Sequence, residues 1–449
     1  MRRELAGSNP GPTRPSQVRR RQGRMMRFGV AKDLITPDLP TYMGGYGSFF
    51  NKPFQGVHDD LYVRALLVQD GETKLIFVSL DLLFHDFALT EELQKWSEAT
   101  FHIPADHFFL TYSHTHGGPA MVGYDDASQH SPSYERFLLS RIKSCVSRAM
   151  VNTFEGTLQA GGVNGDWNIN RRLSADGEIQ NLPNPEGAKD DRLHVLRVLD
   201  LDGRTKVVLF NYACHPVTVR DTLYLSGDYP GRICHLLEAE YFGAMGIFFQ
   251  GAGGNSRPKA TAYKGMFITC TYDEINEMAI SIVQAIKLLL TNPKAMVQVQ
   301  PDVAACQFKV HLEIDPYPKS HFAAIASDPA SRPGLVGMAN RVLNHYDHMP
   351  DYVILPAGLI RLSADLYIAY MGGEPCYEVK RKLERLFPGV TLLFWGYADA
   401  TAYIPDDQII VEGGYEAEGS VVEYGLKGPF RPGIDKRMAE AFTAAFRAL

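Results

Sequence analysis

Two histidines separated by one residue stand out in the segment "TYSHTHGGPAM", which runs from Thr111 to Met121. They are His114 and His116, which follow the apolar run "HFFL" and precede a Gly-Gly-Pro turn. Residues two apart on a strand face the same side, so one imidazole could ligate a metal while the other lies beside it. The small residues after the pair would let a ligand approach the backbone. The pair could equally be polar residues at an ordinary strand end, and the segment alone leaves both interpretations open.

Three more residues occupy a similar position, after an apolar run and beside small residues. His215 follows the run in "FNYACHPV", Glu374 follows "LYIAYMGG", and Tyr403 ends "LLFWGYADATAY". α/β sheets collect their ligands at the C-terminal tips of strands, so this shared position favours one functional site. Asp81, in "VSLDLLFHD", could orient a ligand histidine or simply begin a turn.

The elements that must position these residues are short strands alternating with helices. Apolar residues recur at helical spacing over residues 89–101, 133–154 and 272–290. The order predicts an α/β fold with layered mixed β-sheets, flanking helices and few tight hairpins. Residues 161–190 are polar and rich in Gly, Asn and Pro, which predicts a long functional loop containing "NINRR".

Composition excludes several function classes. The 449 residues carry a formal net charge of -6 with acids and bases mixed, so no nucleic-acid partner is expected. The six cysteines lack CxxC spacing, which favours a reducing, cytoplasmic location. Residues 1–25 are basic and rich in Pro, Gly and Ser, without the apolar stretch of a secretory signal, and are predicted to be a disordered leader. No transmembrane segment is expected, and the sequence leaves homo-oligomerisation open.

From Met26 onward the chain resembles the catalytic domain of the neutral, non-lysosomal ceramidase family. "SHTHGGP" is similar to the family's "THTHSGP", "NINRR" to its "NINRS", "CHPVT" to its "HPT" and "SGDYPG" to its "DYPG". "GGEP" corresponds to its "GE" turn, and "YIPDDQIIVEGGYEAEGS" to its closing tyrosine segment. Each motif is short, but their common order is specific. The resemblance implies that residues 26–449 form one ceramidase-like metallohydrolase domain.

The resemblance also implies a metal site and a reaction. It places a zinc ion (Zn²⁺) at four residues, which are His114, His215, Glu374 and Tyr403. The implied reaction is hydrolysis of an amide bond in a small-molecule or lipid-like N-acyl substrate by metal-activated water.

Three further positions match residues that act in catalysis in the family. His116 would move a proton to the leaving amine, whereas Arg171 and Tyr415 would stabilise the oxyanion. These roles suit the side chains, because arginine stays cationic and tyrosine is a donor at neutral pH.

One departure from the family pattern concerns the substrate. The family has a "GDVSP" turn where this chain has "GGNSRP", which puts Arg257 at the serine's place and Asn255 at the aspartate's. The chain also ends at Leu449 without the strand-rich extension of the family's immunoglobulin-like domain. These differences favour a substrate smaller or more polar than ceramide. Hydrolysis of an ester, lactone or glycosidic bond, or an inactive binding homologue, are the alternatives.

Overall fold

The computed structural model describes residues 25–38, 41–46, 49, 52–121, 131–220 and 222–449. Residues 1–24 of the predicted leader lie outside this set. Among the described residues, no helix is long and apolar enough to cross a bilayer.

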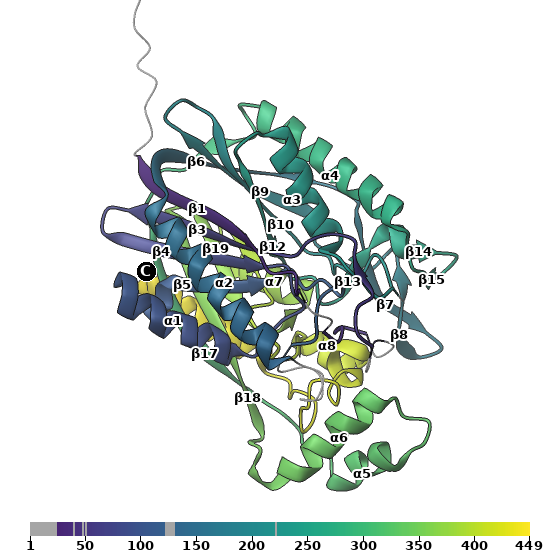
Figure 1. Ribbon diagram of the computed structural model, residues 1–449. Helices are drawn as coiled ribbons and strands as arrows, with labels where there is room; N and C mark the ends of the chain where they lie inside the picture. Colours follow the sequence, from purple (N-terminus) through teal and green to yellow (C-terminus); the bar gives the residue numbers. More distant parts are fainter. Residues whose placement is uncertain (1–24, 39–40, 47–48, 50–51, 122–130, 221) are drawn as a thin grey trace, which may run out of the picture.

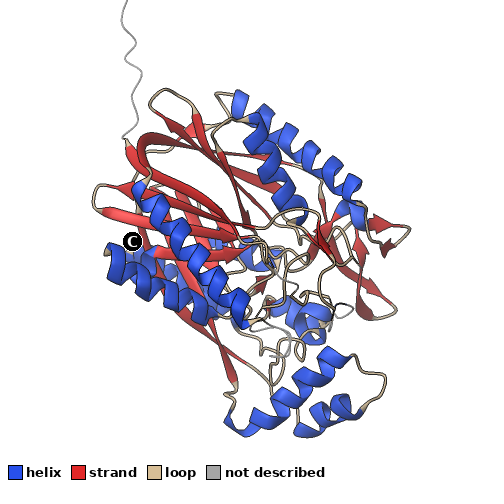
Figure 2. Cartoon of the chain, in the orientation of Figure 1, coloured by secondary structure: helices blue, strands red, loops and turns tan. Residues whose placement is uncertain are grey.

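Two β-sheets form the centre of the molecule (Figures 1 and 2). The larger sheet has the order β12-β10-β9-β6-β1-β3-β4-β5, with β16 paired to β6, and the smaller has the order β17-β18-β19-β21. Both sheets mix parallel and antiparallel pairs. The strands of the larger sheet are β1 (Met26–Leu34), β3 (Tyr62–Asp70), β4 (Thr73–Leu80), β5 (Phe108–Tyr112), β6 (Thr153–Asn164), β9 (Arg192–Asp200), β10 (Thr205–Tyr212), β12 (Met245–Gln250) and β16 (Val297–Gln298). Those of the smaller sheet are β17 (Ala304–Glu313), β18 (Tyr352–Ser363), β19 (Leu366–Met371) and β21 (Thr391–Trp395).

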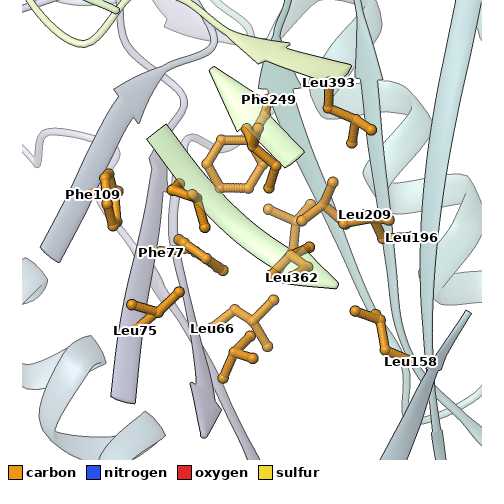
Figure 3. Close-up of a cluster of buried hydrophobic side chains, with 14 of the residues drawn as sticks. Leu66, Leu75, Phe77, Phe109, Leu158, Leu196, Leu209, Phe249, Leu362 and Leu393 are labelled. Atoms are coloured by element: carbon orange, nitrogen blue, oxygen red, sulfur yellow. The ribbon is translucent and has the colours of Figure 1, made fainter. Parts of the chain in front are cut away.

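Apolar side chains from both sheets form one buried layer between them. Figure 3 shows Phe77, Leu209 and Phe249 of the larger sheet facing Leu362 and Leu393 of the smaller one. Alternate residues along a strand point to opposite faces, so each strand contributes every second side chain to this layer. The close packing fixes the two sheets, and therefore the ends of their strands, relative to each other.

Helices cover the outer faces of both sheets. α2 (Pro132–Val151) packs on β1 and β3, and α3 (Asp228–Glu240) packs on β12 with α4 (Tyr272–Thr291) beside it. α7 (Tyr377–Leu386) and α9 (Ile434–Ala448) contribute apolar residues to the core on the outer side of the smaller sheet. The remaining α-helices are α1 (Phe87–Phe101), α5 (Lys319–Ser327), α6 (Pro333–His345) and α8 (Asp407–Glu412). The predicted α/β fold of layered mixed sheets with flanking helices is confirmed.

The predicted loop over residues 161–190 is wrong, because most of it is a β-hairpin. β7 (Asn168–Ala175) and β8 (Glu178–Asn184) pair antiparallel, and β13 (Ser256–Pro258) adds a third strand. Asp176 and Gly177 both have positive φ, at 55° and 84°, as a two-residue hairpin turn requires. Polar residues occupy both faces of these strands, so the alternation that reveals a half-buried strand is absent. Tight hairpins also join β3 to β4 and β18 to β19, contrary to expectation.

The other strands are two-residue pairs at the edges of loops. They are β2 (Gly56–Val57) with β11 (Tyr224–Leu225), β14 (Ala262–Tyr263) with β15 (Met266–Phe267), and β20 (Glu374–Pro375) with β22 (Tyr403–Ile404). The α5–α6 pair has a small apolar core of its own and extends from the body at the lower end of Figure 1.

Asp81 forms a buried ion pair, and none of its hydrogen bonds among the described residues is to a histidine. Its Oδ2 accepts from Arg64 Nη1 at 2.7 Å and from the Tyr62 N–H at 3.0 Å. Asp81→Asn would leave the buried Arg64 charge without compensation, so we expect the free energy of unfolding to fall by about 3–5 kcal/mol. Urea denaturation measures this fall. Asp202→Asn, at an exposed ion pair, should cost less than about 1 kcal/mol. A similarly small cost for Asp81→Asn would contradict the structural importance of the pair.

Candidate metal centre and active site

Four residues predicted from the sequence converge at one buried point. Glu374 Oε2 lies 3.3 Å from His114 Nε2 and 2.7 Å from His215 Nε2. The hydroxyl oxygen of Tyr403 lies 3.2 Å from His215 Nε2. All four side chains are almost completely buried. We call His114, His215, Glu374 and Tyr403 the candidate metal centre.

The two histidines of this centre lie just beyond the ends of strands. His114 follows β5 by two residues and has a φ of 66°, which a non-glycine residue adopts mainly at sites where the surrounding structure enforces it. His215 follows β10 by three residues, and its N–H donates to the Ser256 carbonyl at 3.1 Å. The strand ends therefore place the imidazoles, as their sequence positions predicted.

Glu374 and Tyr403 are direct partners in the short parallel pair of β20 and β22. The Glu374 N–H donates to the Ala402 carbonyl at 2.7 Å, which fixes the carboxylate beside the phenol. Tyr403 was expected at the tip of the strand "LLFWGYADATAY". That strand, β21, ends at Trp395, so Tyr403 reaches the centre through the separate strand β22.

Three imidazoles direct their Nε2 atoms to the same space. In each, Nδ1 lies between 2.7 and 3.1 Å from a backbone carbonyl oxygen, which can only accept a hydrogen bond. The pairs are His114 with Leu83, His116 with Gly45, and His215 with Gly253. A neutral imidazole that donates from Nδ1 has a lone pair on Nε2. The same arrangement orients metal-ligating histidines in proteins generally.

The Nε2 atoms of these imidazoles lie close together. His114 Nε2 and His116 Nε2 are 3.3 Å apart, and the candidate ligand atoms of His114, His116 and His215 all lie within 4.8 Å of one another. Burial, with His114 and His215 nearby, lowers the pKa of His116 well below its ordinary value, and burial lowers that of His215 to about 4. Nitrogen and carboxylate oxygen atoms this close together need a shared proton or a metal ion among them. The donor set therefore fits a divalent metal ion.

Glu374 supplies the negative charge that such an ion requires. Burial opposes its ionisation, but His114 and His215 outweigh burial and hold the pKa of Glu374 well below its ordinary value. Tyr424 donates a hydrogen bond from its hydroxyl to Glu374 Oε1, which leaves Oε2 directed at the imidazoles. Tyr424 was not predicted from the sequence.

A cavity of about 270 Å³ opens beside the candidate metal centre. We call it the site cavity, and its wall includes His116, Arg171, Tyr403 and Tyr415. The structure thus brings together all three residues that were expected to act on the substrate. Gly45 fixes the position of His116, because its carbonyl accepts from Nδ1 and a Cβ at Gly45 would lie only 2.8 Å from that atom.

Arg171 is held in the cavity wall by a buried carboxylate. Its Nε donates to Glu416 Oε1 at 2.8 Å, and Arg172 donates to the other oxygen of Glu416 at 2.7 Å. The guanidinium carbon lies 5.1 Å from the centre of the Tyr403 ring and 5.3 Å from that of Tyr415. Burial opposes the charge, but Tyr403 and Glu416 raise the pKa of Arg171 well above its ordinary value. Arg171 Nη2 is buried and finds no acceptor among the described residues.

Tyr415 begins a short turn of π-helix at Tyr415–Gly419. Its hydroxyl donates to Glu423 Oε2 at 2.6 Å, and Arg332 donates to the other oxygen of Glu423. The Tyr415 ring packs edge-on against the Tyr403 ring, with 5.3 Å between their centres. The predicted oxyanion donor is therefore in the site, with its proton directed to Glu423.

Comparison with known proteins shows the family to which the chain belongs. Residues 27–256 match the family described as neutral/alkaline non-lysosomal ceramidase, N-terminal. The chain belongs to the neutral/alkaline non-lysosomal ceramidase family. This ceramidase-family membership supports a hydrolase that acts on amide bonds.

Two solved ceramidase structures share the fold. The crystal structure of neutral ceramidase from Pseudomonas aeruginosa is similar with a TM-score of 0.73 and 18% sequence identity, over 93% of this chain and 73% of the other. A ceramidase complexed with C2 is similar with the same TM-score and identity, over 94% of this chain and 75% of the other.

The turn "GGNSRP", which departs from the ceramidase-family pattern, contacts His215 of the candidate metal centre. The carbonyl oxygens of Gly253 and Ser256 in this turn accept from the ring and the backbone of His215. Asn255 donates from Nδ2 to Glu378 Oε2 at 2.7 Å and accepts from the Tyr377 N–H at 3.0 Å. Asn255 therefore ties the turn to the start of α7. Arg257, two residues further on, lines the site cavity.

Proposed function

We propose that this chain is a metal-dependent hydrolase that cleaves an amide bond in an N-acyl substrate, with zinc held by His114, His215, Glu374 and Tyr403. The convergence of imidazole nitrogens and a carboxylate beside a cavity carries this proposal. A zinc ion bound there would act as a Lewis acid toward the carbonyl oxygen and lower the pKa of a water molecule.

Residues of the cavity wall would carry out the remaining steps. His116 Nε2 takes a proton from the attacking water and passes it to the leaving nitrogen as the C–N bond breaks, giving a carboxylic acid and an amine. Its low pKa keeps it unprotonated before the reaction. Arg171 stabilises the negative charge that develops on the carbonyl oxygen, and Tyr415 adds a second hydrogen bond once its hydroxyl turns from Glu423.

The cavity favours a substrate smaller or more polar than a ceramide with two long chains. Its wall near the metal centre consists mainly of arginine, tyrosine and histidine side chains, and a volume of about 270 Å³ suits a small N-acyl compound.

Removal of metal should abolish the activity. We expect a chelator to eliminate hydrolysis of N-acyl substrates and added zinc to restore it, because the ligand set cannot otherwise activate water. A panel of short- and long-chain amides, each with its matched ester, measured before and after chelation, tests both bond and metal. Activity that survives complete chelation, or cleavage of esters alone, would contradict the proposal.

A further inference from the structure

The wall of the site cavity is unusually basic. Its described lining includes four arginines but one carboxylate, and these charged residues are Arg171, Arg220, Arg257, Arg332 and Glu423. Arg171 is neutralised by Glu416 and Arg332 by Glu423. Two guanidinium groups, those of Arg220 and Arg257, therefore remain without a carboxylate partner among the described residues.

Arg257 is the more deeply buried of the two. Arg257 lies at the centre of β13, opposite Ile169 of β7, and 8% of its surface is exposed to solvent. Its guanidinium carbon lies 4.3 Å from the centre of the Phe267 ring, and its Nε finds no acceptor among the described residues. Burial, with Arg171 nearby, lowers the pKa of Arg257 to about 10, so the group is still charged at neutral pH. A buried charge without a partner is costly, and proteins rarely retain one that serves only the fold.

Arg220 enters the same cavity from the loop that follows His215. The Thr269 hydroxyl accepts from the Arg220 N–H at 2.7 Å and donates to its carbonyl at 3.1 Å, which fixes the backbone of Arg220. Its guanidinium carbon lies 5.9 Å from the centre of the Tyr46 ring. It lies near enough to Arg257 to lower the pKa of that residue. Two like charges are thus held on one wall by separate elements.

We propose that the substrate is an N-acyl compound with an anionic group, a carboxylate, phosphate or sulfate, which Arg257 and Arg220 bind in the site cavity. Guanidinium groups match these oxyanions through paired hydrogen bonds, which are strong where water is excluded. The family pattern has a serine at the place of Arg257, so this charge belongs to the present chain. The inference rests on the proposed function, because it names the substrate class of the same site.

Matched substrates test the anion preference. Short N-acyl amino acids and N-acyl compounds with a phosphate or sulfate ester would each be compared with a neutral analogue of the same size. In Arg257→Gln we expect the ratio of kcat/KM for the charged over the neutral member to fall about 10- to 100-fold. The matched control is Arg204→Gln, at an exposed arginine remote from the cavity lining, which should leave the ratio unchanged. An unchanged ratio in Arg257→Gln for every class of anion would overturn the inference.

Binding without catalysis separates this inference from the proposed function. Calorimetric titration of the chelated protein with inorganic phosphate and with a short N-acyl amino acid should show at least about tenfold weaker binding in Arg257→Gln than in Arg204→Gln. Weaker anion binding in Arg257→Gln, in a protein that cleaves no amide, would support the anion site and contradict the proposed hydrolase. Amide hydrolysis with equal anion binding in both variants would support the hydrolase and contradict the anion site.

Thermal melting distinguishes a ligand-binding role from a structural one. Removing an unpaired buried charge should leave the melting temperature of ligand-free Arg257→Gln equal to or above that of the wild type. A melting temperature several degrees lower would show that Arg257 serves the fold and would overturn the inference.

Discussion

Replacing Glu374 with glutamine is expected to remove the bound metal and to reduce kcat/KM by more than about 100-fold. Mutating a residue that hydrogen-bonds to a metal ligand typically lowers metal affinity or activity by about 10- to 100-fold. Glu374 is placed as a direct ligand, so its loss should have a larger effect. Glutamine retains the size of the side chain and an oxygen for the Tyr424 hydroxyl, so packing is preserved while the charge is lost. Metal content and hydrolysis would be measured on the same sample.

Glu378→Gln is the matched control for this experiment. Glu378 is a half-buried carboxylate in α7 that accepts from Asn255 and supplies no ligand atom to the candidate metal centre. We expect it to retain its metal. Full metal content in Glu374→Gln would show that this carboxylate is not a ligand, whatever the activity of the variant.

Replacing His116 with alanine is expected to reduce kcat by about 10²- to 10⁴-fold while the metal stays bound. The expected loss is that of a group that moves a proton in the transition state. The Nε2 atoms of His116 and His114 are only 3.3 Å apart, a distance that also allows His116 to be a ligand itself. Loss of metal together with activity would assign it that role and contradict the proton transfer.

His194→Ala provides the control for loss of a buried imidazole. His194 lies in β9, is also buried, and has a pKa held well below its ordinary value by burial with Lys380 and Arg192 nearby. It does not line the site cavity. We expect both metal content and kcat to remain within about twofold of the wild type, since surroundings alone do not make a histidine catalytic.

The positions of the candidate ligands could be predicted because they follow strong apolar runs. His114 and His215 each stand within three residues of a buried strand, and strand ends are the part of an α/β fold where side chains of distant segments meet. The order of the motifs then linked them to Glu374 and Tyr403. Apolar periodicity also predicted the helices over residues 133–154 and 272–290, where α2 and α4 lie.

The partners of these residues could not be predicted, because they depend on packing between remote segments. Glu416 hydrogen-bonds to Arg171 although the two are 245 residues apart in the sequence. Tyr424 and Glu374, which also share a hydrogen bond, are 50 residues apart. Nothing in the surrounding sequence distinguishes Glu416 from an exposed acid. The hairpin of β7 and β8 was missed for a related reason, since its buried face is held by ion pairs and amide hydrogen bonds in place of an apolar stripe.

Other predictions from the sequence concern the protein beyond its site. The cytoplasmic location stays a prediction, and the oligomeric state stays open. All six cysteines are free thiols in the structure.

The central claim is that His114, His215, Glu374 and Tyr403 bind one zinc ion. Crystals of the wild-type protein grown with zinc, measured above and below the zinc absorption edge, test it most directly. We predict one strong anomalous peak within about 2.0–2.2 Å of the two Nε2 atoms and Glu374 Oε2. No peak at this point, or a peak held by other residues, would contradict the metal centre and the mechanism built on it.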